Sequence, residues 1–364
     1  MNWNLQSIIT LSLLKKPDNL SKIKSAATYN SIDNYIEALQ QGQQSITFPE
    51  DNNYKQLSNE AAEQIALAEK NDIQIVTYWD DAYPQLLKEI DDPPIVLYVK
   101  GTLQQSDALS ISIVGTRHCT HYGKLAAEKF AADFVSNNIV ITSGLAYGID
   151  SVAHRSAIDN GGITYAVIAS GIDKINTQIS IKLAEKIIES NGAIITEFRC
   201  GTNAFPPFFL QRNRIISGIS KATLVVECGY KSGALSTARH ALKQNREVFA
   251  VPGPIFAAKS IGCNQLIHGH PRLGNAFMAI SPTAMLEDIG IVVKATKQQS
   301  TKEIAFNTPE EKLIYSKLSD QPQHIDTITE LTGLDIPSVS AFLLEMEFDN
   351  LVKQLPGKHY VKAV

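Results

Sequence analysis

Residues 111–117 read Ile-Ser-Ile-Val-Gly-Thr-Arg, an apolar run of strand-forming residues that ends in a glycine-containing turn. The pattern returns at residues 139–145, Ile-Val-Ile-Thr-Ser-Gly-Leu, and at residues 224–233, where Leu224–Glu227 leads into a glycine-rich turn. Each turn precedes a stretch with helical periodicity, and this alternation predicts βαβ crossovers and a parallel sheet. We expect the three turns to lie at one edge of the sheet, where proteins of this class bind ligands.

The same edge is expected to favour anions. A helix N-terminus presents unpaired N–H groups and the positive end of the helix dipole, which favour phosphate. Residues 211–218, Gln-Arg-Asn-Arg-Ile-Ile-Ser-Gly, add two permanent cations. If this segment is extended, Arg212 and Arg214 face opposite ways, so one is expected to pair with a carboxylate such as Glu197 or Glu227 and the other to reach a phosphate-rich ligand.

The composition indicates an ordinary globular protein. The 364 residues are 44% hydrophobic and 19% charged, with a formal net charge of −4, so nucleic-acid binding would require a local basic patch. The cysteines form no C-x-x-C pair, which argues against a zinc site or a disulfide scaffold. Lys15 and Lys16 follow the first apolar stretch, the reverse of a signal peptide, and no run reaches transmembrane length. We therefore expect a cytoplasmic protein without a metal or a cofactor.

Three segments follow one another along the chain. Residues 1–71 have helical periodicity and predict a small helical module of SAM-like type, and residues 72–290 predict an extended Rossmann-like domain. A polar linker is predicted at residues 291–304. Residues 305–364 predict a winged-helix-like domain, with a helix-turn-helix around Gly333 and a hairpin that turns at Pro356 and Gly357.

The central segment resembles the DNA-processing protein A family, called DprA or Smf. Its signatures occur here in order and together over about residues 73–267: Tyr83-Pro84, Asp92-Pro93-Pro94, Val114-Gly115-Thr116-Arg117, Ser143-Gly144-Leu145-Ala146, Gly148-Ile149-Asp150, Arg212 to Ser217, Ser232-Gly233, Val251-Pro252-Gly253 and Gly262-Cys263-Asn264. The resemblance implies a protein that binds single-stranded DNA through an extended Rossmann domain. It also implies a homodimer and a role in loading the RecA recombinase onto DNA during natural transformation.

Some positions depart from the family pattern. Tyr147 stands where the family often has Arg, which exchanges a possible phosphate contact for an aromatic face. Asn176 and Thr177 replace a common Tyr-Pro pair. Residues 268–272, His-Gly-His-Pro-Arg, resemble a small insertion to which we assign no function.

The expected DNA site combines backbone donors, cations and one ring. Backbone N–H groups at two turns and three arginines are predicted to hold phosphates, while one amide contacts a base or a sugar. A ring in the segment around Pro206 and Pro207 could stack on a base, although a packed loop is the more common role of such rings. Glycines in such turns also serve local backbone geometry alone. The predicted DNA-contacting residues are Gly115, Thr116, Arg117, Ser143, Gly144, Phe208, Arg212, Asn213, Arg214, Ser232 and Gly233.

Other function classes fit the sequence less well. A dinucleotide dehydrogenase would require G-x-G-x-x-G after the first strand, which the turn at Gly115 lacks. A lysine-decarboxylase-like phosphoribohydrolase is the stronger alternative, but the helix after Gly233 lacks that family's Glu, and no general acid–base pair is evident. A structural adaptor that contacts RecA without DNA is a third. We therefore predict a non-enzyme without catalytic residues.

The C-terminal segment is expected to serve protein contacts more than duplex DNA. Its candidate recognition helix, near residues 337–350, carries Glu345, Glu347 and Asp349. Phosphates in the major groove repel such a helix.

Overall fold

The structure is a computed structural model, and it describes residues 3–14, 17–40, 54–104, 108–175, 177–293, 306, 308–319, 321–349 and 351–362. Its contacts define two compact units: a larger one with most residues up to Val293, and a smaller one with the C-terminal elements. Asn176, Lys15, Lys16 and the linker beyond Val293 lie outside the described residues.

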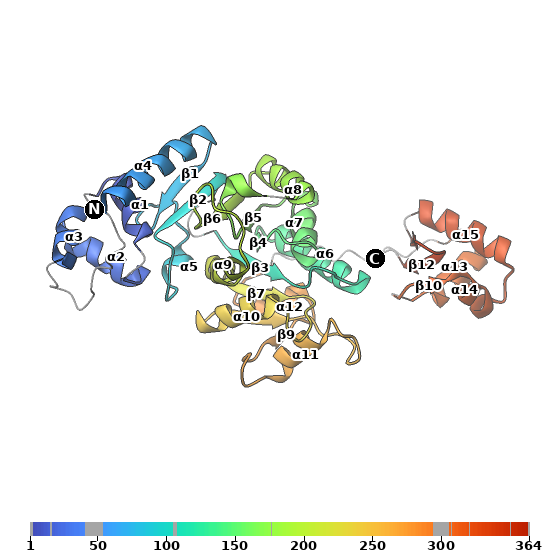
Figure 1. Cartoon of the computed structure of the whole chain (residues 1–364). Coiled ribbons are helices and arrows are strands. Elements are labelled where there is room, and N and C mark those ends of the chain that lie inside the picture. Colours follow the sequence, from blue (N-terminus) through green and yellow to red (C-terminus); the bar gives the residue numbers. More distant parts are fainter. Residues whose placement is uncertain are drawn as a thin grey trace. The chain divides into compact units, whose positions relative to one another are not determined.

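The larger unit is built on a sheet with the strand order β1-β2-β6-β5-β4-β3-β7-β8-β9 (Figure 1). From β6 to β9 all neighbours are parallel, whereas β1 and β2 are antiparallel to their neighbours. The predicted parallel sheet is therefore confirmed. The strands are β1 Gln74–Thr77, β2 Val96–Gly101, β3 Ser110–Val114, β4 Val140–Ser143, β5 Thr164–Val167, β6 Ala193–Thr196, β7 Ala222–Val225, β8 Glu247–Ala250 and β9 Phe277–Met278.

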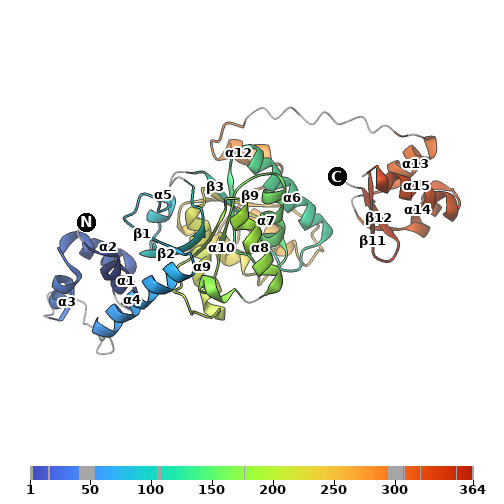
Figure 2. The same cartoon turned by 90° about the horizontal axis from the view of Figure 1, so that it is seen from above.

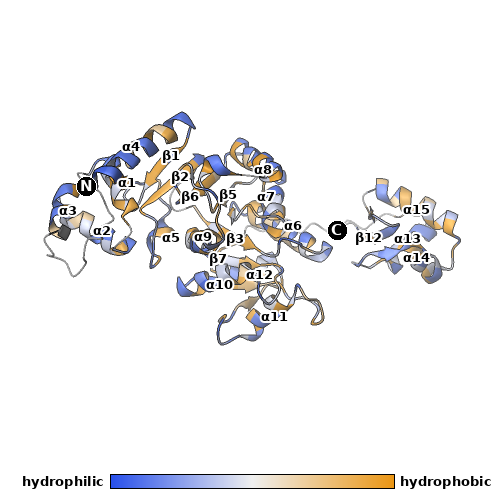
Figure 3. Cartoon of the chain, in the orientation of Figure 1, coloured by the Kyte–Doolittle hydropathy of each residue, from blue (hydrophilic) through white to orange (hydrophobic). Residues whose placement is uncertain are grey.

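Helices cover both faces of this sheet (Figure 2). One face packs against α6 His121–Ser136, α7 Ile149–Asp159, α8 Gln178–Glu189 and α12 Pro282–Asp288. The other packs against α5 Gln85–Lys88, α9 Pro206–Ile219, α10 Ala234–Lys243 and α11 Ile261–His268. Strands buried on both sides are mainly apolar, and the central strands colour mostly as hydrophobic in Figure 3.

The order of the strands creates a switch point. From β3 the chain adds β4, β5 and β6 in one direction, and it then returns to place β7, β8 and β9 on the other side of β3. The connections after β3 and after β7 therefore leave the sheet towards opposite sides. They open a crevice at the carboxyl ends of these two strands.

The N-terminal residues form helices, as predicted: α1 Leu5–Leu13, α2 Asn19–Thr28, α3 Ile32–Gln40 and α4 Tyr54–Lys70. Asn4 and Asp18 cap α1 and α2 through their side chains. One hydrophobic cluster joins Tyr35 of these helices to Tyr98 of β2 and Ile187 of α8. The core therefore continues across the predicted boundary at residue 71, and the boundary itself stays a prediction.

The smaller unit has the predicted winged-helix arrangement. Its helices are α13 Pro309–Lys317, α14 Ile325–Thr332 and α15 Ile336–Phe348, and its strands β10 Gln323–His324, β11 Val352–Leu355 and β12 His359–Lys362 pair in the order β10-β12-β11. Gly333 ends α14 with a φ of +70°, the left-handed conformation that glycine adopts without strain. Val339, Leu343 and Met346 of α15 are fully buried in its core.

Candidate functional site

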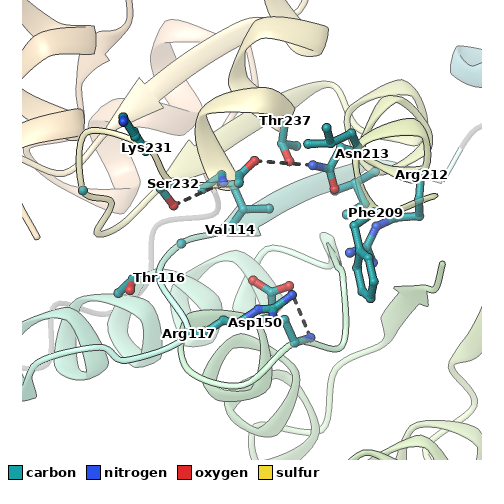
Figure 4. A pocket seen from close by; sticks show the side chains of 17 residues that line it. Val114, Thr116, Arg117, Asp150, Phe209, Arg212, Asn213, Lys231, Ser232 and Thr237 are labelled. Atoms are coloured by element: carbon teal, nitrogen blue, oxygen red, sulfur yellow. Dashed lines mark hydrogen bonds between the residues drawn. The ribbon is translucent and has the colours of Figure 1, made fainter. Parts of the chain in front are cut away.

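A pocket of about 420 Å³ lies at the switch point. Figure 4 shows Lys231 and Ser232 on one side of it and Phe209 and Arg212 on the other. It is built from the turns after β3, β4 and β7 and from α9, so the structure brings together the three turns that the sequence singled out, although Ala146 alone represents the turn after β4. Its lining residues are Val114, Gly115, Thr116, Arg117, Ala146, Asp150, Phe209, Leu210, Arg212, Asn213, Ile216, Gly229, Lys231, Ser232, Gly233, Ala234 and Thr237.

The turn after β3 lines the pocket, but its backbone is already engaged. The N–H of Thr116 donates to the Glu227 carbonyl oxygen at 2.7 Å, which argues against the predicted phosphate contact of this N–H and leaves that contact a prediction. A Cβ on Gly115 would lie 2.5 Å from Cγ1 of Ile149, so this glycine allows α7 to pack closely against β3. The turn therefore serves packing more than ligand binding.

The turn after β4 is closed by a carboxylate of the protein itself. Oδ2 of Asp150 accepts hydrogen bonds from the N–H groups of Gly144 at 3.1 Å and Ala146 at 3.4 Å. Ser143 is fully buried, and its hydroxyl donates to the Ile113 carbonyl oxygen at 2.6 Å. These bonds argue against the predicted phosphate contacts of Ser143 and Gly144, because Asp150 occupies the place of the anion, and the contacts stay a prediction.

Asp150 belongs to a buried charged group with Arg212. Burial raises the pKa of the Asp150 carboxyl, and the charge of Arg212 opposes that shift. Burial also lowers the pKa of Arg212 to about 10, which leaves it charged at neutral pH. The Arg212 guanidinium donates to the carbonyl oxygens of Gly144, at 2.8 Å, and of Val167. Arg212 thus forms part of the pocket wall, and its hydrogen bonds hold the backbone at the ends of β4 and β5 in place.

His154 lies in the same buried region. Its Nδ1 is 2.7 Å from the Thr164 hydroxyl, which itself donates to the Ile141 carbonyl oxygen, so the ring carries its proton on Nδ1. Burial lowers the pKa of His154 to about 3, with a further contribution from the charge of Arg212. The ring is neutral at physiological pH.

Residues 211–218, which carry Arg212 and Arg214, are helical, so the extended conformation considered for them is wrong. Residues 206–219 form α9, with Pro206 and Pro207 at its first positions, where proline is favoured. The helical period places Phe209, Arg212, Asn213 and Ile216 on one face, and all four line the pocket. The two prolines were the signal in the sequence that could have predicted this helix.

Arg214 faces away from the pocket. Its guanidinium forms a two-pronged ion pair with Glu197, with both N···O distances 2.7 Å, and contacts Asp92 at 3.0 Å. Burial lowers the pKa of Arg214, but Glu197 and Asp92 raise it more, and the net shift is upward. The prediction that one arginine pairs with Glu197 is confirmed. The ion pairs of Arg214 argue against its predicted phosphate contact, which stays a prediction.

The ring that faces the pocket is Phe209, which the sequence prediction missed. Its centroid lies 5.6 Å from the guanidinium carbon of Arg117 and 6.0 Å from that of Arg212. Phe208 instead stacks on Phe198 at 4.5 Å and contacts Phe205, and it does not line this pocket, so its DNA contact stays a prediction that the pocket does not support. Phe208 packs against other rings, as expected for this segment, but the segment is a helix and not a loop.

Two exposed cations remain at the pocket. Arg117 follows β3 and Lys231 follows β7, and neither forms an ion pair within the part of the chain that the structure describes. Lys231 was not singled out in the sequence, although it lies inside the turn from Gly229 to Gly233 that was. These two side chains give the pocket a positive mouth.

The N-terminus of α10 also opens into the pocket. Gly233 is its N-cap and makes no side-chain cap, and the nearby hydroxyl of Ser232 accepts from the N–H of Ala234 at 3.3 Å. Gly233 has an ordinary helical conformation, with φ −59°, and a Cβ built on it would meet nothing within 4 Å. Neither backbone conformation nor packing therefore requires glycine here. Close approach of a ligand to the backbone would require it.

A doubly wound α/β unit with a cationic pocket at its switch point, joined to a winged-helix unit, defines a Rossmann-like binding protein with an added winged-helix domain. The family model of DNA recombination-mediator protein A matches residues 74–288, and that of the DprA winged helix domain matches residues 296–358. The chain belongs to the DNA recombination-mediator protein A family, as the sequence motifs predicted.

Known relatives agree with this assignment. Protein Smf of Escherichia coli is 34% identical over 283 residues, which cover 76% of this chain and 74% of that protein. DNA processing protein A (DprA) of Streptococcus pneumoniae has a TM-score of 0.64 and 28% identity, over 79% of this chain and 99% of that one. DNA processing protein A of Helicobacter pylori, described for its single-stranded DNA binding mode, has a TM-score of 0.52 and 26% identity, over 59% and 95% of the two chains.

None of the described helices combines the length and the apolar content needed to span a bilayer. Within the described residues, no group of three or more His, Cys, Asp or Glu side chains is arranged to hold a metal ion.

Proposed function

We propose that this protein binds single-stranded DNA and that the pocket at the switch point holds its phosphates. The observation that carries the proposal is the pocket mouth, where Arg117, Lys231 and the α10 N-terminus converge on one opening. Cations and a helix N-terminus together favour phosphate. The Helicobacter pylori relative, which is described as binding single-stranded DNA, supports the choice of ligand.

The roles within the site follow from exposure. Arg117 and Lys231 contact phosphates because their charges are exposed. Asn213 is buried in the wall of the same pocket, where its amide donates to the Gly233 carbonyl oxygen at 3.4 Å, and we propose it as the contact to a base or a sugar. Phe209 offers its ring to an unpaired base. Arg212 and Arg214 act as positioning residues, since the buried partners described above hold both guanidinium groups. Stacking and phosphate contacts read little sequence, so sequence preference is low.

Further parts of the proposal rest on the family resemblance. The protein would act in natural transformation, load RecA onto single-stranded DNA, form a homodimer and reside in the cytoplasm. Two DNA sites in one homodimer would engage one strand with avidity. We propose the domain boundaries at residues 71, 290 and 304 as they were predicted from sequence.

We also propose that the protein is not an enzyme. Asp150 accepts the N–H groups of Gly144 and Ala146, and Arg212 donates to the carbonyl oxygens of Gly144 and Val167, so both side chains are engaged in the rim, which leaves them a structural role. A nucleoside monophosphate incubated with the protein should be recovered intact by chromatography. Release of a free base would favour the phosphoribohydrolase alternative.

The winged-helix unit is proposed to serve protein contacts. Its helix α15 exposes 53% of Leu344 and 78% of Phe348 beside the acidic Glu345. Apolar and acidic side chains together suit a protein partner better than a phosphate backbone.

The test replaces one exposed cation at a time. Arg117→Ala and Lys231→Ala should each weaken binding to oligothymidine by roughly 1–3 kcal/mol, because each removes a charge-assisted contact. Each should also reduce the slope of log affinity against log salt by about 0.7, the value for one phosphate on a single strand. Arg155→Ala is the matched control, because Arg155 is exposed on α7 and does not line the pocket.

Fluorescence anisotropy over a salt series measures both quantities. Wild-type affinity and slope in Arg117→Ala and Lys231→Ala would contradict the proposed site. An equal loss in the Arg155→Ala control would show a diffuse electrostatic effect instead of a pocket.

A further inference from the structure

Two loops next to the pocket expose aromatic rings that the packing does not use. Tyr230, in the turn after β7, is 60% exposed, and Phe256, in the loop after β8, is 95% exposed. Both loops leave the carboxyl ends of parallel strands, at the edge of the sheet that carries the pocket. An exposed aromatic ring lacks the favourable free energy of burial, so two such rings at one edge of the sheet indicate a binding surface.

The two loops lie directly against each other. A Cβ on Gly229 would be 3.4 Å from the Ala258 carbonyl oxygen. The N–H of Gly262, which follows the second loop, donates to the Cys228 carbonyl oxygen at 2.9 Å. The two rings are therefore carried by adjoining backbone segments.

This surface continues from the pocket. Gly229 and Lys231 line the pocket, whereas Tyr230 between them does not. Tyr230 thus stands just outside the opening, in the loop that adjoins the loop after β8. A strand whose phosphates enter the pocket would extend over this ring next.

The charge of the two loops suits the same occupant. Residues 229–233 and 252–260 contain Lys231 and Lys259 and no aspartate or glutamate. Rings interspersed with lysines match a chain of alternating bases and phosphates. A purely apolar protein partner gains nothing from the two lysines.

We infer that Tyr230 and Phe256 form a stacking platform for unpaired bases, which extends the bound strand from the pocket over the loops after β7 and β8. The inference rests on the proposed single-strand binding and adds a second subsite to it. A long oligothymidine would engage the pocket and the platform, and a short one the pocket alone.

The test compares ring-removing and ring-keeping variants. Tyr230→Ala and Phe256→Ala should each weaken binding of the long oligothymidine by roughly 5- to 150-fold, the range for one stacked base. Tyr230→Phe and Phe256→Trp should retain it. The salt slope should stay at the wild-type value, because stacking releases few counterions. Ile255→Ala is the matched control, since Ile255 is aliphatic, 74% exposed and in the same loop.

The outcomes separate this inference from the proposed function. If both alanine variants bind the long strand like wild type while Arg117→Ala does not, the platform is overturned and the pocket stands. If wild-type protein fails to bind single strands at all, both are overturned. Light scattering gives the molar mass, and a Phe256→Ala variant that turns a dimer into a monomer would assign the ring to a second copy of the chain and overturn the platform.

Discussion

Replacement of Gly233 separates ligand binding from folding more sharply than any other single change in the pocket. Gly233→Ala adds one methyl group at the N-terminus of α10, at a point where a Cβ meets nothing within 4 Å. The backbone has φ −59° and ψ −27°, which alanine adopts without strain. The folded protein itself should therefore accept the change.

Two small terms set the expected stability. Alanine restricts the unfolded chain and adds about 0.4–1 kcal/mol of stability, while an N-cap prefers glycine to alanine by a similar amount. The two terms offset, so the free energy of unfolding should stay within about 0.5 kcal/mol of wild type. Urea denaturation measures this value.

Binding should fall in the same variant. The new methyl group would stand between the phosphate and the helix N-terminus and would remove one close, charge-assisted contact, worth about 1.5–3 kcal/mol. Affinity for oligothymidine should fall by roughly 10- to 150-fold. Gly233→Val, with a larger side chain, should lower it further.

A matched control lies on the same helix. Ser236→Ala changes α10 one turn further on, at a residue that does not line the pocket, and should leave affinity unchanged. Wild-type affinity in both Gly233 variants would refute the reasoning, because it would show that no ligand approaches this backbone.

Three further predictions concern the buried charges and the C-terminal unit. Arg214→Ala should lower the free energy of unfolding by about 3–5 kcal/mol in urea denaturation, because Glu197 then stays buried without its partner. The salt slope of oligothymidine binding should not change. Burial lowers the pKa of His154 to about 3, so below pH 6.5 this residue binds a proton in the unfolded chain but not in the folded protein. The free energy of unfolding should therefore decrease as the pH falls, by up to about 1.4 kcal/mol per pH unit from this residue. His154→Gln should show a shallower pH dependence, and an equally steep one would contradict the assignment. Deletion of the residues from Asn307 onward should preserve a preference for single strands over duplex of equal length in anisotropy titrations, and complete loss of single-strand binding by the folded truncation would move the DNA site to the winged helix.

The sequence was sufficient to predict the fold class and the edge of the sheet that carries the pocket. Apolar β-branched runs ending in glycine turns, as in residues 111–117, define strands and the start of each crossover locally, since both depend on short-range periodicity. The helical N-terminal segment and the C-terminal winged helix follow from the same kind of signal. The order of the motifs along residues 73–267 was sufficient to identify the family.

The division of roles at the site required the tertiary structure. Ser143 and Gly144 have the residue types of a phosphate turn, but Asp150, six residues beyond Gly144, accepts the Gly144 N–H group. Arg214 finds Glu197 seventeen residues away in sequence, on another element. Sequence spacing cannot show which donor already has a partner, because that depends on three-dimensional contacts.

The helical phase of α9 decided which aromatic ring and which arginine face the pocket. Phe208 and Phe209 are neighbours in sequence, yet a rotation of about 100° per residue directs them to different surroundings. The prolines at 206 and 207 mark the helix start, but only the packing of α9 on the sheet fixes which face points into the crevice. The sequence by itself therefore determined most of the elements, though not helix α9, and the edge where a ligand would bind. The fold decided which side chains remain free to bind it, since pairing and exposure arise only when distant segments meet.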